Sequence, residues 1–153
     1  MVKVCDIRYL ASHARNESTV AFAIVRSLSR PIDGVTQLDV LSPSKSLFYA
    51  YCGWKDAGQW NAAKFQDAYV PRFLSEIRND KAAHLALKDI WERDRNGETV
   101  LLGCFCPDEA LCHRSIIAGL LTGIGVKVET DTGSDYIGYY RQYRQLPKPS
   151  FAA

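Results

Sequence analysis

Apolar and polar positions along this chain alternate between the spacings of strands and of helices. Short apolar runs at residues 2–9, 35–41, 99–105 and 126–129 have the length of strands, and stretches with apolar residues three or four apart lie between them. The run at 99–105 is nearly continuous, as in strands buried on both faces of a parallel sheet. Alternation of strands and helices predicts an α/β fold. We expect one three-layer, Rossmann-like α/β domain over residues 1–153, with a mostly parallel sheet.

The stretches between these strands have the apolar spacing of helices. Pro71 lies inside one of them, and because proline lacks an amide donor, it should kink or divide that helix. Gly97 follows the helical stretch at residues 80–95, in the position of a helix C-terminal cap. Residues 53–60, which contain two glycines and two tryptophans, are expected to form a loop. The expected helices cover residues 16–29, 44–51, 61–78, 80–95, 112–123 and 136–144.

Composition narrows the class of protein further. Apolar and charged contents are ordinary for a globular chain, and the formal net charge of +2 is too small to indicate nucleic acid as a partner. No segment approaches the roughly 20 apolar residues that span a bilayer, so we expect no membrane partner. The first residues lack the apolar core of a signal peptide. We expect a cytoplasmic protein whose five cysteines stay reduced.

Three of these cysteines gather where the apolar run at 99–105 ends. Cys104 and Cys106 are two residues apart, so on a strand both side chains would point to one face. Cys112, His113 and Arg114 then begin the next helical stretch. Loops at the carboxyl ends of parallel strands commonly hold ligands in this fold class. We therefore place the candidate site here, and three interpretations of it remain open.

The first interpretation is a pocket for a small anionic or nucleotide-like ligand. Free amides at a helix start favour an anion, and the guanidinium of Arg114 suits phosphate or carboxylate. Ser115 and Cys106 lie beside it in the sequence. His13 and Arg15 follow the first predicted strand, where ligands are also contacted. These five residues are the expected ligand-binding set.

The second interpretation adds chemistry at the same place. The field of the helix start should lower the pKa of Cys112 and raise its thiolate fraction. His113 is the candidate for proton transfer, because imidazole titrates near neutral pH. Cys104 or Cys112 would shape or activate the site. The protein would then be a small hydrolase or glycosyl-transferring enzyme, and the alternative is a module that binds a nucleotide or signal without reaction.

The third interpretation is a metal site formed by Cys104, Cys106, Cys112 and His113. Thiolates with an imidazole select zinc, or iron as the other possibility. Seven residues separate Cys106 from Arg114, whereas a phosphatase loop needs five, so that motif does not match. No Gly-x-Ser-x-Gly sequence is present for a serine nucleophile.

Aromatic and basic residues outside residues 100–115 suggest two further candidate ligand contacts, one for nucleic acid and one at the mouth of the pocket. The tail at 131–153 holds four tyrosines and two arginines between 136 and 144, a composition that can stack on single-stranded nucleic acid. We favour a C-terminal segment that covers the sheet instead. Lys45, Lys55 and Lys64, with Trp54 and Trp60, are candidates for the pocket mouth, although tryptophan more often packs in the core or at its rim.

Two blocks of sequence now point to a family. Residues 41–47, Leu-Ser-Pro-Ser-Lys-Ser-Leu, are followed by Trp60, Phe65 and Tyr69, and residues 100–114 run from an apolar strand to Cys-His-Arg. Over residues 35–129 the chain resembles the domain of unknown function 488 family.

The resemblance implies an α/β domain with a pocket near the Cys-His-Arg turn, and it supplies no settled reaction. The spacing from Cys104 to Cys112 matches the family pattern. Cys106 departs from it, because it stands where the family usually has glutamate. This departure favours metal or thiol chemistry over acid–base chemistry at that position.

Overall fold

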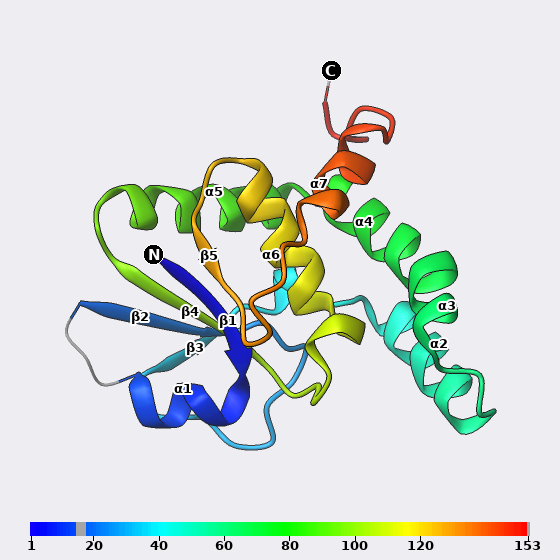
Figure 1. The fold of residues 1–153 in the computed structure, drawn as a ribbon, viewed down its shortest axis with the longest axis horizontal. Helices are drawn as coiled ribbons and strands as arrows, with labels where there is room; N and C mark the ends of the chain where they lie inside the picture. Colours follow the sequence, from blue (N-terminus) through cyan, green and yellow to red (C-terminus); the bar gives the residue numbers. More distant parts are fainter. Residues whose placement is uncertain (15–17, 153) are drawn as a thin grey trace.

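A five-stranded parallel sheet organises the chain in this computed structural model, which describes residues 1–14 and 18–152. The strand order is β3-β2-β4-β1-β5, and every pairing is parallel. This confirms the predicted α/β class with its parallel sheet (Figure 1). The strands are β1 (Val2–Asp6), β2 (Thr19–Ala23), β3 (Val35–Gln37), β4 (Thr99–Cys104) and β5 (Val128–Glu129).

Helices lie on both sides of this sheet. Figure 1 shows α1 below the strands, α5 and α6 above them, and α2 to α4 extending beyond one end. A buried apolar cluster joins the two layers through the sheet, with Leu10, Leu102 and Ile116 fully enclosed. The helices are α1 (Ile7–His13), α2 (Lys45–Asp56), α3 (Ala62–Lys64), α4 (Val70–Arg78), α5 (Lys81–Arg95), α6 (His113–Gly123) and α7 (Ile137–Arg144).

The register of the central strands sets the place of the site. Asp6 of β1 lies opposite Cys104 of β4, and Ala23 of β2 lies opposite Gly103. The carboxyl ends of β1, β2 and β4 are therefore level. Loops that leave these three strands meet at one edge of the sheet, where parallel α/β folds hold their ligands.

The helix predicted for residues 16–29 is wrong. Thr19–Ala23 forms β2, which pairs with β3 on one side and β4 on the other. The apolar run around Phe22 and Ile24 is buried, and its backbone groups bond to both neighbours. A short continuous apolar run fits a buried strand as well as a helix, and only the pairing with β4 decides between them. Residues 16 and 17, at the start of that predicted helix, lie outside the described residues.

Several element boundaries also differ from the expectation. The first strand ends at Asp6, because its carboxylate accepts a hydrogen bond from the amide of Arg8 at 2.9 Å and caps α1. β3 ends at Gln37 and is followed by a 3₁₀ turn, η1 (Asp39–Leu41). Residues 53–56, expected in a loop, continue α2.

The helical stretch that contains Pro71 changes its winding before the proline without a break in the helix. One π-helical turn, η2 (Phe65–Tyr69), follows α3, α4 begins at Val70, and Tyr69 and Val70 keep right-handed helical backbone angles. The wide turn leaves room for Pro71, which has no amide to donate. The wide turn before it brings Phe65 and Tyr69 into the interior.

The C-terminal segment packs closely on α6. A Cβ atom added at Gly119 would overlap the carbonyl oxygen of Tyr136, which is backbone and cannot turn aside. We expect Gly119→Ala to lower the free energy of unfolding by about 2–3 kcal/mol, because overpacking forces the backbone to shift. Urea denaturation measures this. Gly138→Ala is the matched control in α7, since an added Cβ there meets nothing within 4 Å, and equal losses in both variants would contradict the packing.

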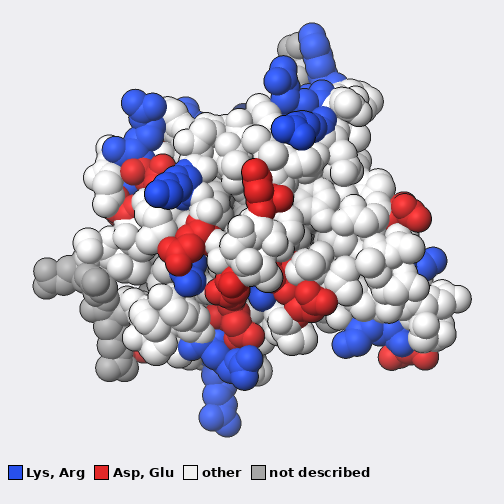
Figure 2. Space-filling view, viewed as in Figure 1, with Lys and Arg blue, Asp and Glu red and all other residues white. Residues whose placement is uncertain are grey.

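Charged side chains of both signs are interspersed over the face drawn in Figure 2, so that face has no broad field of one sign. None of the helices in the described residues is long and apolar enough to cross a membrane.

Candidate metal centre and adjoining cavity

Four soft donor groups meet at the carboxyl edge of the sheet. Cys104 is the last residue of β4, and Cys106 lies in the loop that follows. A short 3₁₀ turn, η3 (Glu109–Leu111), leads to Cys112, which precedes α6, and His113 is the first residue of that helix. Their sulfur and nitrogen donor atoms all lie within 4.8 Å of one another. The site predicted from sequence spacing is therefore assembled in three dimensions.

Four of the six separations between these donors are close to the edges of a tetrahedron. The Sγ of Cys104 lies 3.9 Å from that of Cys106 and 3.4 Å from that of Cys112. The Nδ1 of His113 lies 3.7 Å from the Sγ of Cys104 and 3.8 Å from that of Cys112. Zinc bonds of about 2.3 Å to sulfur and about 2.0 Å to nitrogen give tetrahedral edges of about 3.5–3.8 Å. Little movement would be needed to receive the ion.

His113 is oriented with one nitrogen toward the sulfurs. Its Nε2 lies 2.7 Å from the carbonyl oxygen of Ile24, just after β2, and this acceptor requires a proton on Nε2. Nδ1 is then left with its lone pair among the thiols. Burial lowers the pKa of His113, which favours the neutral ring that binds metals. A ligand histidine commonly donates its other N–H to a carbonyl in this way.

The pKa values of the thiols in the cluster are shifted in opposite directions. The pKa of Cys104 falls to about 4, because the thiols of Cys106 and Cys112 donate to its thiolate, and burial opposes this only in part. The pKa of Cys112 rises well above its usual value, chiefly through burial and then through the neighbouring Cys104. The expected lowering at Cys112 is therefore wrong. Desolvation exceeds the favourable field of the helix start, and the ionised sulfur belongs to β4 instead.

Arg114 lies inside the protein with only 2% of its surface exposed. Its Nη1 donates to the carbonyl oxygen of Cys106 at 2.6 Å, and its Nε is without a hydrogen-bond partner among the described residues. The guanidinium thus braces the loop that carries Cys106. Arg114 does not line the cavity of about 440 Å³ that adjoins the cluster. Its contact with an anion stays a prediction.

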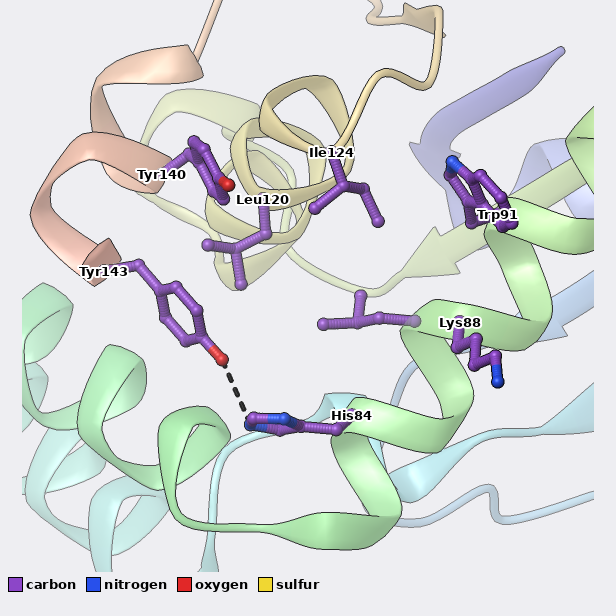
Figure 3. Close-up of a pocket in the computed structure, with 8 residues that line it drawn as sticks. His84, Lys88, Trp91, Leu120, Ile124, Tyr140 and Tyr143 are labelled. Carbon is purple, nitrogen blue, oxygen red and sulfur yellow. Dashed lines mark hydrogen bonds between the residues drawn. The ribbon is translucent and has the colours of Figure 1, made fainter. Parts of the chain in front are cut away.

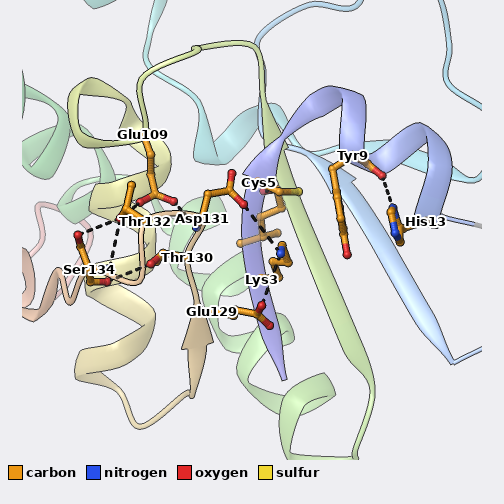
Figure 4. A network of polar contacts seen from close by, with 11 residues as sticks. Lys3, Cys5, Tyr9, His13, Glu109, Glu129, Thr130, Asp131, Thr132 and Ser134 are labelled. Atoms are coloured by element: carbon orange, nitrogen blue, oxygen red, sulfur yellow. Dashed lines mark hydrogen bonds and ion pairs between the residues drawn. The ribbon is translucent and has the colours of Figure 1, made fainter.

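The other predicted ligand-binding residues lie in different surroundings. Ser115 is fully buried, and its hydroxyl donates to the carbonyl oxygen of Cys112 at 2.8 Å. His13 is exposed at the end of α1, where its ring stacks on Tyr9 with 3.7 Å between centroids (Figure 4). The structure does not bring His13 to the cavity lining. Arg15 lies outside the described residues.

A cavity of about 440 Å³ adjoins the cluster, and sequence reasoning missed most of its walls. It opens between the loops after β2 and β4 and the start of α2, and Cys104, Cys106 and His113 form part of its lining. Of the residues considered for the pocket mouth, Lys45 and Trp60 line it, whereas Trp54, Lys55 and Lys64 do not. The other lining residues are Val25, Arg26, Ser27, Pro43, Phe48, Tyr49, Tyr51, Tyr69, Phe105 and Leu111. A second cavity of about 350 Å³ lies between α5, α6 and α7, away from the cluster (Figure 3).

Glu109 fixes the turn between Cys106 and Cys112 from outside. Its buried carboxylate accepts hydrogen bonds from the Asp131 amide at 2.8 Å, the Thr132 hydroxyl at 2.6 Å and the Tyr136 hydroxyl at 2.8 Å. Figure 4 shows Glu109 facing the Asp131–Thr132 segment. The segment that follows β5 therefore holds η3 in place.

This carboxylate makes stability depend on pH. Burial by itself would raise the pKa of Glu109, but the hydrogen bonds from Thr132, Tyr136 and Asp131 outweigh it and lower the pKa. A lowered folded pKa contributes stability above the unfolded pKa of about 4.3, and this contribution is lost as the pH falls through the folded pKa. We expect Glu109→Gln to lower the free energy of unfolding by about 1–3 kcal/mol at pH 7.

Below about pH 4 the difference from the parent should shrink, which urea denaturation between pH 3 and pH 7 measures. Glu129→Gln on β5 is the control, since the Glu129 side chain is 55% exposed. A deficit of Glu109→Gln that stays constant down to pH 3 would count against this role.

The fold and the cluster together define a Rossmann-like α/β protein with a Cys/His site at the carboxyl edge of its sheet. A family model, DUF488-N3a, described as the active DUF488-N3 subclade, matches residues 6–125, and the chain belongs to this family. The match confirms the resemblance and extends it toward the N-terminus beyond residues 35–129. Searches of curated proteins and of solved structures found no match.

Proposed function

We propose that this protein binds a zinc ion through Cys104, Cys106, Cys112 and His113. The observation that carries the proposal is the spacing of the four donor atoms, which lie within 4.8 Å of one another, with four of their six separations near tetrahedral edges. Three thiolates and an imidazole are soft and intermediate donors, a set that prefers zinc, with iron as the alternative. The Ile24 carbonyl supplies the outer contact that orients the imidazole.

The site would be a closed one. Four protein ligands leave no open position, which is typical of structural zinc. The ion would neutralise thiolates that are otherwise costly to bury. By joining the end of β4 to the start of α6, the four residues would hold the loop that forms one wall of the cavity.

Metal analysis of freshly purified protein tests this proposal. We expect about one zinc per chain, and cobalt in its place should give the visible absorption of a tetrahedral thiolate site. Cys104→Ser and Cys112→Ser should lose the metal. Cys52→Ser is the matched control, because Cys52 lies in α2 outside the cluster and should retain it. Protein that contains no metal and takes up none after anaerobic reduction would refute the proposal.

A second candidate function is a reaction at the same place. Cys104, Cys106 and His113 line a cavity at the carboxyl edge of the sheet, and the chain belongs to the active DUF488-N3 subclade. Under this proposal the protein is a small hydrolase or glycosyl-transferring enzyme for a nucleotide-like anion. The thiolate of Cys104 would attack the substrate and displace its leaving group, and Nδ1 of His113 would accept a proton from the water that then releases the bound product from the sulfur.

Incubation of metal-free, reduced protein with a panel of nucleotides and nucleosides separates the alternatives. Formation of a free base, phosphate or nucleoside that disappears in Cys104→Ser would support the enzyme. Saturable binding with unchanged ligand would support a non-catalytic binding module. Activity that persists in Cys104→Ser would exclude Cys104 as the nucleophile.

A further inference from the structure

The cavity beside the cluster has a wall of mutually packed aromatic rings. Tyr51 and Trp60 are 4.7 Å apart between ring centroids, and Tyr69 lies 5.7 Å from Trp60, edge to face. Tyr51 comes from α2, Trp60 from the loop after it, and Tyr69 from the π-helical turn. Because each ring is held by the others, the wall is preformed.

The rim of the cavity is aromatic as well, although water reaches it. Phe48, Tyr49 and Phe105 are 46%, 68% and 56% exposed and all line the cavity. Large apolar side chains usually face the core, so three exposed rings around one opening indicate a surface that a ligand covers. Phe105 stands between the two cluster residues Cys104 and Cys106, which places this rim directly beside the site.

Positive charge lies at the same opening. Arg26, which follows β2, and Lys45, the first residue of α2, both line the cavity, and none of the described residues that line it carries a carboxylate. The Nε of Arg26 donates to the carbonyl oxygen of Pro43 at 2.7 Å, which fixes the guanidinium at the mouth. The start of α2 itself is excluded from this argument, because Glu76 already accepts hydrogen bonds from the amide and hydroxyl of Ser44.

We infer that this cavity binds a small molecule with a flat aromatic ring and an anionic group, such as a nucleoside monophosphate. The ring stacks within the aromatic wall and rim, and the anion lies between Arg26 and Lys45. A volume of about 440 Å³ is in the usual range for a ligand of this size. The inference gives the second candidate function its ligand class and rests on that same pocket. It differs from the sequence-based expectation in assigning the anion to Arg26 and Lys45 rather than to Arg114.

Calorimetric titration of the protein as purified tests the inference. The probes are the four common nucleoside monophosphates and phenyl phosphate, with adenosine and ribose 5-phosphate as ligands that lack one of the two groups. We expect saturable binding of at least one aromatic phosphate, and binding at least tenfold weaker without the ring or without the phosphate. The double variant Arg26→Gln, Lys45→Gln should bind the phosphate ligand about 10–100-fold more weakly than the parent. Its affinity for adenosine should be unchanged, since only hydrogen bonds to the charged group are lost.

A rim variant and a matched control complete the test. Phe105→Ala removes an exposed ring with little effect on folding and should weaken every aromatic probe. Lys88→Gln and Trp91→Leu change a cationic and an aromatic residue in the second cavity (Figure 3). Both variants should bind all probes with the affinity of the parent. No saturable binding of any aromatic phosphate, or equal binding by the Arg26/Lys45 variant and the parent, would overturn the inference.

Metal content and turnover measured in the same samples keep the proposals apart. Nucleotide binding by protein that contains no zinc and takes up none would overturn the zinc proposal alone. Binding without turnover by metal-free, reduced protein would overturn the enzyme and leave the ligand assignment standing.

Discussion

Removal of zinc with a chelator is expected to lower the melting temperature of the protein by roughly 10 °C. An ion held at a thousand times its dissociation constant contributes about 4 kcal/mol to folding. For a chain of 153 residues, each kcal/mol moves the midpoint by roughly 2–4 °C. Without the ion, Cys104, Cys106 and Cys112 are left as a crowded thiol cluster with one ionised sulfur. Calorimetry or circular dichroism with and without chelator, under reducing conditions, measures the shift.

The comparison variants make this result specific to the cluster. Cys112→Ser should melt at the chelated temperature and show no further response to chelator, because a buried hydroxyl is a poor zinc ligand. Cys52→Ser should respond like the parent. An unchanged midpoint on chelation, in protein shown to have lost its metal, would mean that the ion does not support the fold.

Replacement of Arg114 with alanine is expected to lower the free energy of unfolding by about 3–4 kcal/mol. The change removes one of the largest fully buried side chains, leaves the carbonyl of Cys106 without its donor, and takes a cation away from the buried Glu109. The loop between Cys104 and Cys112 should loosen as a result. Urea denaturation measures the loss, and amide hydrogen exchange locates it.

An exposed arginine provides the control for this prediction. The side chain of Arg8 is 87% exposed and pairs with Asp6 at the end of β1, so Arg8→Ala should leave the free energy of unfolding almost unchanged. If Arg114→Ala folds with parental stability but loses phosphate binding, the result would contradict this prediction and support the direct anion contact expected from the sequence.

The metal cluster could be predicted from sequence because its members are close along the chain. Cys104 to His113 span ten residues, and a strand, a short turn and a helix start leave few ways to arrange them. The pKa of Cys112 could not be predicted in the same way. Sequence shows the helix start and its favourable field, whereas the depth of burial that reverses the shift depends on how other segments pack around it.

The error at β2 has a related cause. Val20, Ile24 and Leu28 fit a helical spacing, but the same residues around Phe22 also form a continuous apolar run. The choice depends on β4, almost 80 residues later, whose edge supplies the backbone partners of β2. A local pattern cannot show a partner so distant in the sequence.

The sequence alone determined the class of fold, the strand–loop–helix unit at its centre and the four donors of the candidate metal site, because these follow from short-range periodicity and spacing. Tertiary structure decided which side chains face the cavity. Arg26, Tyr51 and Tyr69 reach it from three separate segments, and the carbonyl that orients His113 lies 89 residues away along the chain. Parallel strands bring their carboxyl ends together only when the whole sheet is assembled, so a site built at that edge combines residues that no local pattern connects.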